Sequence, residues 1–348
     1  MDLSPFTAYT DPRSATRPRP RVSVVVPCYN EEAVIAETHR RLAAACTEAA
    51  GDDWEIVYVN DGSRDGTWPI LERIAREEHC VVAVDLSRNF GHQLAVSAGL
   101  SLARGARILM IDADLQDPPE LLPKMMVLMD EGADVVYGRR TQRLGETAFK
   151  RGTAKVFYRV LRAATDVEIP VDTGDFRLMS RRVLDELLKL PEQHRFLRGL
   201  VAWLGFRQVP IDYVREARFA GETKYPLKRM LRFAFDAIAG FSSAPLRLSI
   251  WFAGLSMAIA MLVGMYVLVS WLFFDTTRGW ASLLLVIAFF SAVQLFCLGM
   301  LGEYVGRIYG EAKGRPLYVL REIVAKPDEP AADTAARQAA RETSDAAK

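Results

Sequence analysis

The sequence predicts an α/β protein in which a doubly wound, mostly parallel sheet is followed by an interfacial amphipathic helix and a two-helix transmembrane hairpin. Three observations lead to this fold class. Short apolar runs alternate with helical patterns up to about residue 140, as in parallel sheets that carry helices on both faces. A segment at 226–248 combines an apolar stripe with basic residues, and two long uncharged runs follow at 249–274 and 280–302.

Short runs rich in β-branched and aliphatic residues are the expected strands. They lie at 22–26, 54–60, 81–85, 108–111 and 135–137. Segments whose apolar residues have helical spacing follow the first four strands, at 31–50, 67–78, 92–104 and 118–131. We expect 22–225 to form one domain, within which 141–225 is a connecting region where aromatic and basic residues interleave.

Ligands of a doubly wound sheet bind beyond the carboxyl ends of its strands. The loops expected at those ends read PCYNEE, NDGSRDGT, SRNFGHQ, DADLQDPPE and GRRTQR. Each of them is polar and contains side chains capable of chemistry, so we expect the functional site among these loops.

The runs at 249–274 and 280–302 are the expected membrane spans. They hold 26 and 23 residues without a charge, and at about 1.5 Å per residue each helix exceeds the hydrocarbon core of about 30 Å. A pair of buried core helices is the alternative. Basic residues precede the first run and follow the second: Lys228, Arg229, Arg232, Arg247, Arg307, Lys313 and Arg315. The positive-inside rule therefore places both termini in the cytoplasm.

The segments around these spans complete the organisation. A basic amphipathic helix at 226–248 would lie in the headgroup plane, or it packs only on the preceding domain. Residues 1–21 have no apolar stretch, which predicts a disordered leader and no signal peptide. Residues 306–325 are the expected cytoplasmic C-terminal segment, and 326–348 the disordered tail. The four cysteines have neither metal nor disulfide spacing, which suits a reducing compartment.

Two carboxylates one residue apart, Asp112 and Asp114, follow the expected fourth strand. In an extended chain both side chains point the same way, and Gln116 repeats that parity if the extended conformation persists. These oxygens suit Mg²⁺ or Mn²⁺ that is bound together with substrate phosphates. Such a metal would neutralise charge on a diphosphate leaving group. An ordinary pair of surface carboxylates is the alternative.

The loops after the first two strands offer groups that could bind a nucleotide. Tyr29 could stack on a base, and Asn30 or Glu31 could bind base or ribose, although simple capping of the next helix by Asn30 is the better interpretation of this motif alone. Asp61 could accept a hydrogen bond from a uracil N–H. A plain Asp-Gly turn with Gly62 explains the same residues equally well.

Basic residues are concentrated in the middle of the chain, where they could hold a second, anionic substrate. Any single one of them is better explained as a solvated surface charge. The set comprises Arg139, Arg140, Arg143, Lys150, Arg151, Arg177, Arg181, Arg218 and Lys224.

Eight segments in this order resemble family 2 glycosyltransferases of the polyprenyl-phosphate type, over about residues 22–320: PCYNE, NDGS, RNFGHQ, DADLQDPPE, GRR, DTGDFRLMSR, GETKYPLKRMLRF and GMLGEYVGRIY. The most similar members look like bactoprenol glucosyltransferases, with dolichol-phosphate mannose synthases and aminoarabinose transferases of lipid A as relatives. The resemblance implies a GT-A catalytic domain that transfers one sugar with inversion. It also implies a UDP-sugar donor, with UDP-glucose favoured, and undecaprenyl (polyprenyl) phosphate as acceptor.

The resemblance further implies a Mg²⁺ or Mn²⁺ cofactor, a homotetramer in the bacterial inner membrane and no nucleic-acid partner. It places these residues in the nucleotide site: Pro27, Tyr29, Asn30, Glu31, Asp61, Asp112 and Ala113. It makes Asp114 and Gln116 the metal ligands. It assigns the acceptor phosphate to Arg139, Arg140, Arg151, Lys155 and Arg218, and catalysis to Asp114, Asp117, Arg139 and Lys224. This chain departs from the mannose synthases at Lys155, where they have Ser, and from some relatives at Asp117, where they have His or Asn.

Two other functions compete with this interpretation. Processive polysaccharide synthases share the fold, but they carry a Gln-x-x-Arg-Trp motif and usually more spans. Here the nearest segment reads QHRF at 193–196. A membrane protein that binds a nucleotide-sugar without turnover, such as a sensor or a flippase subunit, is the other alternative, and a turnover assay separates it from an enzyme.

Overall fold

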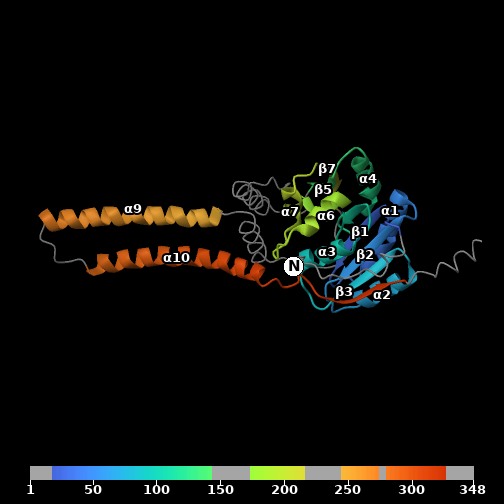
Figure 1. Ribbon diagram of the computed structural model, residues 1–348, viewed down its shortest axis with the longest axis horizontal. Helices are drawn as coiled ribbons and strands as arrows, with labels where there is room; N and C mark the ends of the chain where they lie inside the picture. The colour runs from blue at the N-terminus through green and yellow to red at the C-terminus, as the bar shows by residue number, and fades with distance from the viewer. Residues whose placement is uncertain (1–17, 143–172, 216–243, 274–279, 327–348) are drawn as a thin grey trace, which may run out of the picture.

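The computed structural model describes residues 18–142, 173–215, 244–273 and 280–326. An α/β domain forms one end of the molecule, and two long helices project from it side by side (Figure 1). Most of the expected leader, most of the amphipathic helix at 226–248 and nearly all of the tail lie outside the described residues.

The described strands form one eight-stranded sheet: β1 (Val22–Cys28), β2 (Trp54–Asn60), β3 (Val81–Leu86), β4 (Arg107–Met110), β5 (Val135–Gln142), β6 (Thr173–Ser180), β7 (Gln208–Val214) and β8 (Leu320–Ala325). Their order in the sheet is β7-β5-β6-β4-β1-β2-β3-β8. Parallel pairing joins β4, β1, β2 and β3 in the centre, and β5 to β7. β6 is antiparallel to both of its neighbours, and β8 is antiparallel to β3.

Helices cover both faces of this sheet, which confirms the predicted doubly wound architecture. One core contains α1 (Ile35–Ala50), α2 (Thr67–Glu77) and, after the short 3₁₀ turn η1 (Pro119–Leu121), α4 (Leu122–Asp130). The opposite core contains α3 (His92–Leu102), α6 (Arg181–Lys189) and α7 (Leu197–Trp203). Because successive strand residues face opposite ways, Val24 and Val26 lie in the first core and Val25 in the second.

The region from 141 to 225, expected to be a connection, contains β6, α6, α7 and β7 in its described part. β6 inserts between β4 and β5, so that its residue Leu178 pairs with Leu109 of β4 on one side and with Val136 of β5 on the other. Its segment TGDFRLMS carries Asp175 and Arg177, so it lacks the apolar alternation by which a strand is usually found. Pairing with two neighbouring strands makes it a strand.

The segment after the second long helix returns to the sheet as β8, which the sequence analysis did not expect. The Tyr318 side chain is buried, and its hydroxyl lies 2.7 Å from Ser101 Oγ on α3. Arg321 donates to the buried carboxylate of Asp85 at 2.8 Å and to the carbonyl oxygen of Ser87 at 2.7 Å. The C-terminal segment is therefore an integral edge of the sheet.

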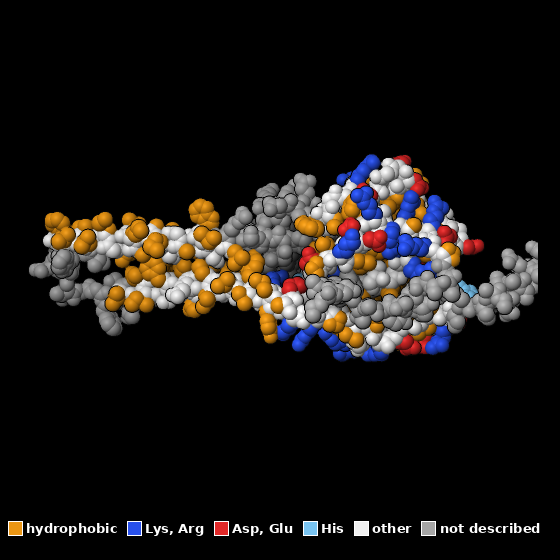
Figure 2. Space-filling model, in the orientation of Figure 1, with side chains coloured by type: hydrophobic (Ala, Val, Ile, Leu, Met, Phe, Trp, Pro, Cys, Tyr) orange, Lys and Arg blue, Asp and Glu red, His pale blue; other side chains and the backbone are white. Residues whose placement is uncertain are grey.

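The two long helices are α9 (Ala244–Phe273) and α10 (Trp280–Ala312). Their segments Ser249–Tyr266 and Phe289–Ala312 are long and apolar enough to cross a membrane, and neither is buried within the protein. Figure 2 shows hydrophobic side chains along the outside of both helices. The helices pack through rings of Phe252 and Phe296, whose centroids are 5.4 Å apart. They are the predicted candidate spans, and α10 ends at Ala312 rather than at 302.

Candidate active site

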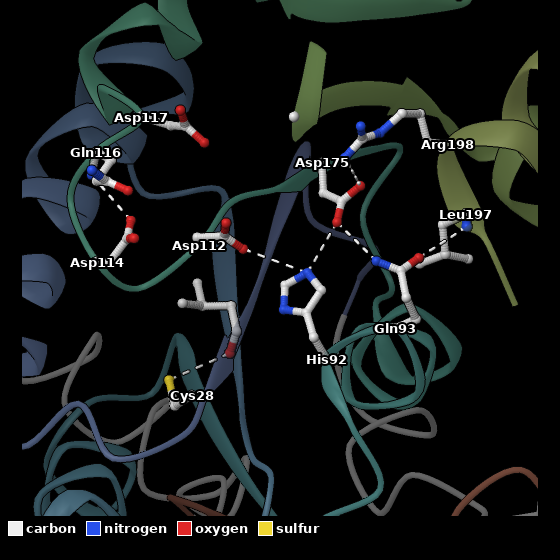
Figure 3. A network of polar contacts seen from close by, with 12 residues as sticks. Cys28, His92, Gln93, Asp112, Asp114, Gln116, Asp117, Asp175, Leu197 and Arg198 are labelled. Atoms are coloured by element: carbon white, nitrogen blue, oxygen red, sulfur yellow. Dashed lines mark hydrogen bonds and ion pairs between the residues drawn. The ribbon is translucent and has the colours of Figure 1, made fainter. Parts of the chain in front are cut away.

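The loops that follow β1 to β4 meet at the carboxyl edge of the sheet, as predicted. β6 brings another segment to this edge, because its antiparallel pairing places Arg177 opposite Met110, the last residue of β4. Asp175, two residues before Arg177, consequently lies near Asp112, two residues after Met110. Figure 3 shows the polar side chains that gather between these strand ends.

The Asp112–Gln116 segment is a turn and does not continue the strand. β4 ends at Met110, and Leu115 adopts a positive φ of 57°, which is uncommon for a residue other than glycine. The backbone N–H of Gln116 donates to Asp114 Oδ1 at 3.2 Å. The extended conformation assumed for Asp112, Asp114 and Gln116 does not persist, because local side chain–backbone bonding replaces it. The expectation that Asp112 and Asp114 point the same way is therefore wrong.

This turn nevertheless brings together the two predicted metal ligands. In Figure 3 the side chains of Asp114 and Gln116 lie beside each other, whereas Asp112 points toward His92. Among the described residues, no group of three His, Cys, Asp or Glu side chains could hold a metal ion. Two oxygen donors on one turn fit a hard cation whose remaining ligands come from substrate phosphates and water.

His92 links Asp112 to Asp175. Its Nε2 lies 3.0 Å from Asp175 Oδ2 and 3.6 Å from Asp112 Oδ1. Gln93 donates from Nε2 to the same Asp175 oxygen at 2.8 Å, and Arg198 lies 3.3 Å from the other oxygen. Asp175 is thus held on three sides, by residues from α3 and α7.

The charges of this group depend on each other. Burial opposes the charge on His92, but Asp112 and Asp175 outweigh it and raise the imidazole pKa to about 9. Burial raises the pKa of Asp112 to about 6; His92 opposes that shift, while nearby carboxylates reinforce it. Burial also opposes the charge on Asp175, yet the hydrogen bond from His92 and the charge of Arg198 hold its pKa well below the usual range.

The loop after β1 is tied to the loop after β2. Asn30 has a positive φ of 56°, donates from its backbone N–H to Ser63 Oγ at 3.0 Å and accepts from the Arg64 N–H at 2.9 Å. The Glu31 N–H donates to Thr67 Oγ1 at 2.9 Å. Helix α1 begins only at Ile35 and has no side-chain cap. The interpretation of Asn30 as a helix cap is therefore wrong; it joins two loops of the predicted nucleotide site.

Asp61 follows β2 and is buried, with both carboxylate oxygens used. Oδ1 accepts from the Phe90 N–H at 2.7 Å and Oδ2 from the Gly91 N–H at 2.9 Å. Burial raises the pKa of Asp61, and these two hydrogen bonds oppose that rise. Gly62 has a φ of 65°, and a Cβ there would lie 2.6 Å from the Asn89 backbone nitrogen. The Asp-Gly pair thus fixes the loop 87–91 against the end of β2.

Asp117 lies in a second polar group, next to Gly174. Its side chain is 1% exposed, and Tyr213 donates its hydroxyl hydrogen to Oδ1. Arg140 lies 3.6 Å from the same oxygen and also donates from Nε to the Tyr213 hydroxyl at 3.1 Å. A Cβ at Gly174 would lie 2.6 Å from the Arg140 guanidinium. Arg140 and Asp117 therefore sit directly beside the strand that carries Asp175.

The other predicted site residues are distributed around these groups. Arg139, half exposed, makes a two-point contact with Asp212 at 2.6 and 2.8 Å. Pro27 is within β1, and the side chain of Tyr29 is exposed at its end. Ala113 is buried and accepts a hydrogen bond from Thr38 at 2.7 Å. The predictions for Arg151, Lys155, Arg218 and Lys224 lie outside the described residues.

Four residues of the site were missed: His92, Gln93, Asp175 and Arg198. Three of them stood in segments that the sequence analysis had singled out, RNFGHQ and DTGDFRLMSR. The two segments are about 80 positions apart, so nothing local indicated that they meet. Arg198 follows the QHRF segment at 193–196, and no sequence pattern indicated a role for it.

Comparisons with known proteins show the family of this chain. The family model for glycosyl transferase family 2 matches residues 23–188. The uncharacterized glycosyltransferase YkcC of Bacillus subtilis (strain 168) is 50% identical over 301 residues, covering 86% of this chain and 93% of that protein. The prophage bactoprenol glucosyl transferase homolog of Escherichia coli (strain K12) is 36% identical, covering 87% and 99%.

A further relative is the SfII prophage-derived bactoprenol glucosyl transferase of Shigella flexneri, which is 38% identical over 305 residues, covering 87% of this chain and 98% of that protein. Each of these alignments covers 86–87% of this chain and more than nine tenths of the relative. The chain belongs to glycosyltransferase family 2, and its domain has the GT-A fold predicted from the sequence.

Proposed function

We propose that this protein transfers one glucose from UDP-glucose to undecaprenyl (polyprenyl) phosphate, with inversion at the sugar carbon. One observation carries the proposal: a glycosyltransferase family 2 domain and two exposed apolar helices occur in the same chain. The first provides for a nucleotide-sugar, and the second gives access to an acceptor that resides in a membrane. The bactoprenol glucosyl transferases named above support the acceptor and the sugar.

The donor would bind over the carboxyl edge of the sheet. Tyr29 and the paired loops around Asn30 and Asp61 would receive the nucleoside, and Asp112 would lie beside it. Asp114 and Gln116 would hold Mg²⁺ or Mn²⁺, which supplies charge neutralisation to the departing diphosphate. The other metal ligands would come from that diphosphate, so the free protein should bind the metal weakly.

In the transfer step an oxygen of the lipid phosphate bonds to carbon 1 of the sugar, while the bond from that carbon to the diphosphate oxygen breaks. UDP leaves with the electron pair of that bond. A lipid phosphate is already ionised at neutral pH, so the attack needs no strong base. Positioning by arginines such as Arg140 and charge stabilisation at the leaving group would supply the acceleration.

We propose the cytoplasmic face of the bacterial inner membrane as the place of this reaction. Basic residues precede the first span and follow the second, which supports that orientation. The return of the chain as β8 puts both ends of the hairpin on the side of the catalytic domain, so the domain would share the side of those basic residues. The homotetramer implied by the resemblance stays a prediction, as do the boundaries of the interfacial helix.

A transfer assay tests the proposal. Purified full-length protein is incubated with undecaprenyl phosphate, MgCl₂ or MnCl₂ and a panel of UDP- and GDP-sugars, and products are identified by mass spectrometry. We expect one hexose to be added to the lipid phosphate with UDP-glucose as donor. Longer glycan products would indicate a processive synthase, and nucleotide-sugar binding without product would indicate a binding protein; either result would refute the proposal.

A further inference from the structure

Four consecutive residues, Phe90 to Gln93, all contact residues of the site. The backbone N–H groups of Phe90 and Gly91 hold Asp61. His92 then reaches Asp112 and Asp175, as described above. Gln93 uses both ends of its amide, donating to Asp175 and accepting from the Leu197 N–H at 3.0 Å. The segment 90–93 therefore connects the residues that follow β2 and β4 with the beginning of β6 and the start of α7. Figure 3 shows the contacts of His92 and Gln93.

Within the segment 90–93, His92 contacts two carboxylates through a single ring nitrogen. Both carboxylates approach the same nitrogen, Nε2, at 3.0 and 3.6 Å. A carboxylate only accepts, so Nε2 must carry the hydrogen, and its single N–H is directed by the shorter distance to Asp175. The N–H cannot satisfy Asp112 as well. A positive charge on the ring, in contrast, attracts both carboxylates at once and reduces their mutual repulsion.

We propose that His92 is a positioning residue of the transfer reaction, and that its positive charge holds Asp112 and Asp175 in a fixed arrangement at the donor site. This inference rests on the proposed function. Without the charge, two carboxylates that share one small space would repel each other, and Asp112 would turn away from the nucleotide-sugar. His92 need not touch the substrate to have this effect.

The surrounding charges are consistent with a protonated ring. The groups that face His92 are Asp112 after β4, Asp175 on β6, Asp61 after β2 and Arg198 on α7. The carboxylates outweigh Arg198 and burial, so the imidazole pKa is raised to about 9. Because the imidazole pKa of folded His92 lies above the ordinary value, the charge on His92 is fully present below about pH 6.5, and its contribution to folding is lost as the pH rises through about 9. Asp112 itself loses its charge below about pH 6, so the charged pair is present between these two values.

Three variants separate the charge from the hydrogen bond. His92→Gln keeps an N–H donor but is neutral, whereas His92→Lys restores a positive charge on a flexible chain. His194→Gln is the control, since His194 is exposed and lies outside the site. We expect His92→Gln to lower kcat about 10- to 100-fold with a smaller change in the donor KM, and His92→Lys to recover part of that loss.

The pH profile provides a readout that a purely structural role would not change. Wild-type kcat should fall as the pH rises through about 9, and the His92→Lys variant should lose that limb or shift it upward. A His92→Gln enzyme with kcat within about twofold of wild type would overturn the proposal. So would a loss of kcat that His92→Lys does not relieve at all while the variant remains folded.

A second measurement does not depend on the reaction. The chain has 4 histidines, so the imidazole signals of ¹⁵N-labelled full-length protein in detergent can be assigned by single substitution. We expect the imidazole pKa of His92 to be about 9, well above the ordinary value of about 6.5, and to fall in an Asp175→Asn variant. Titration of His92 near its ordinary pKa would overturn the inference. Absence of sugar transfer by the wild type would refute the proposed function while leaving this test intact.

Discussion

Arg139 and Arg140 are neighbours on β5, but their guanidinium groups are held by consecutive residues of β7. Arg139 pairs with Asp212, whereas Arg140 donates to the Tyr213 hydroxyl and lies 3.6 Å from Asp117. Successive strand residues face opposite sides of a sheet, so Arg140 alone of the two shares a side with Asp117. The resemblance assigned both arginines to the acceptor phosphate, and the fold distinguishes them.

This relationship predicts unequal effects of two single substitutions. Arg140→Ala should lower transfer to lipid phosphate about tenfold or more, because a charge-assisted contact to phosphate is worth roughly 1.5–3 kcal/mol. Arg139→Ala should lower it less, since the exposed pair with Asp212 occupies its guanidinium. Steady-state kinetics with varied lipid phosphate, together with nucleotide binding by calorimetry, measure both. Equal losses in the two variants would contradict the distinction.

The proposed metal site predicts a requirement at Asp114. Asp114→Asn keeps the shape of the side chain and removes one charge, so it should abolish transfer and raise the metal concentration needed for any residual activity. EDTA should inactivate the wild type, and added Mg²⁺ or Mn²⁺ should restore it. Lys124→Gln, in the exposed part of α4, is a suitable control. Normal turnover of the Asn variant, or of wild type in EDTA, would show that the metal plays no part.

The return of β8 to the sheet predicts that Arg321 supports the loop 87–91, which lies beside the proposed donor site. Arg321→Gln removes the cation beside the buried Asp85 carboxylate and the hydrogen bond to the carbonyl oxygen of Ser87. Ser87 begins the loop 87–91, which is bound to Asp61. Because Arg321 is mostly exposed, we expect a stability loss of only about 1 kcal/mol and a raised donor KM. Thermal unfolding in detergent and donor titrations measure these effects.

The comparison for Arg321 is Arg76→Gln on α2, which removes a similarly exposed pair with Glu72 away from the site. That variant should change neither the unfolding midpoint nor the donor KM appreciably. Arg321→Lys should recover part of the loss. If Arg321→Gln and Arg76→Gln had the same effects, β8 would have no influence on the loop 87–91.

The proposed orientation predicts which positions can be labelled from outside the cell. Cysteines placed at Thr276 or Thr277, between the spans, should react with an impermeant maleimide in intact cells. A cysteine at Arg315 should react only after the membrane is permeabilised. The native cysteines are first replaced by Ala or Ser to provide a silent background. Labelling of position 315 from outside would reverse the orientation and exclude a cytoplasmic donor site.

Local sequence patterns were enough to predict most of the central sheet. β1 to β4 and the helices after them appear within a few residues of their expected bounds, because a buried strand and an amphipathic helix each have a repeat that a short window contains. The two apolar helices and the Asp112–Gln116 segment were also evident. Each depends on neighbouring residues, through uncharged length or through the spacing of oxygen donors.

Only the tertiary structure decided how distant segments complete the site. β6 and β8 contain charged residues that mask their strand character, and pairing with β4, β5 and β3 makes them strands. That pairing brings Asp175 to His92 and Arg321 to Asp85. The face on which Arg140 lies follows from the register of β5 with β7. Register and long-range pairing are determined by burial over the whole sheet, which no local repeat encodes.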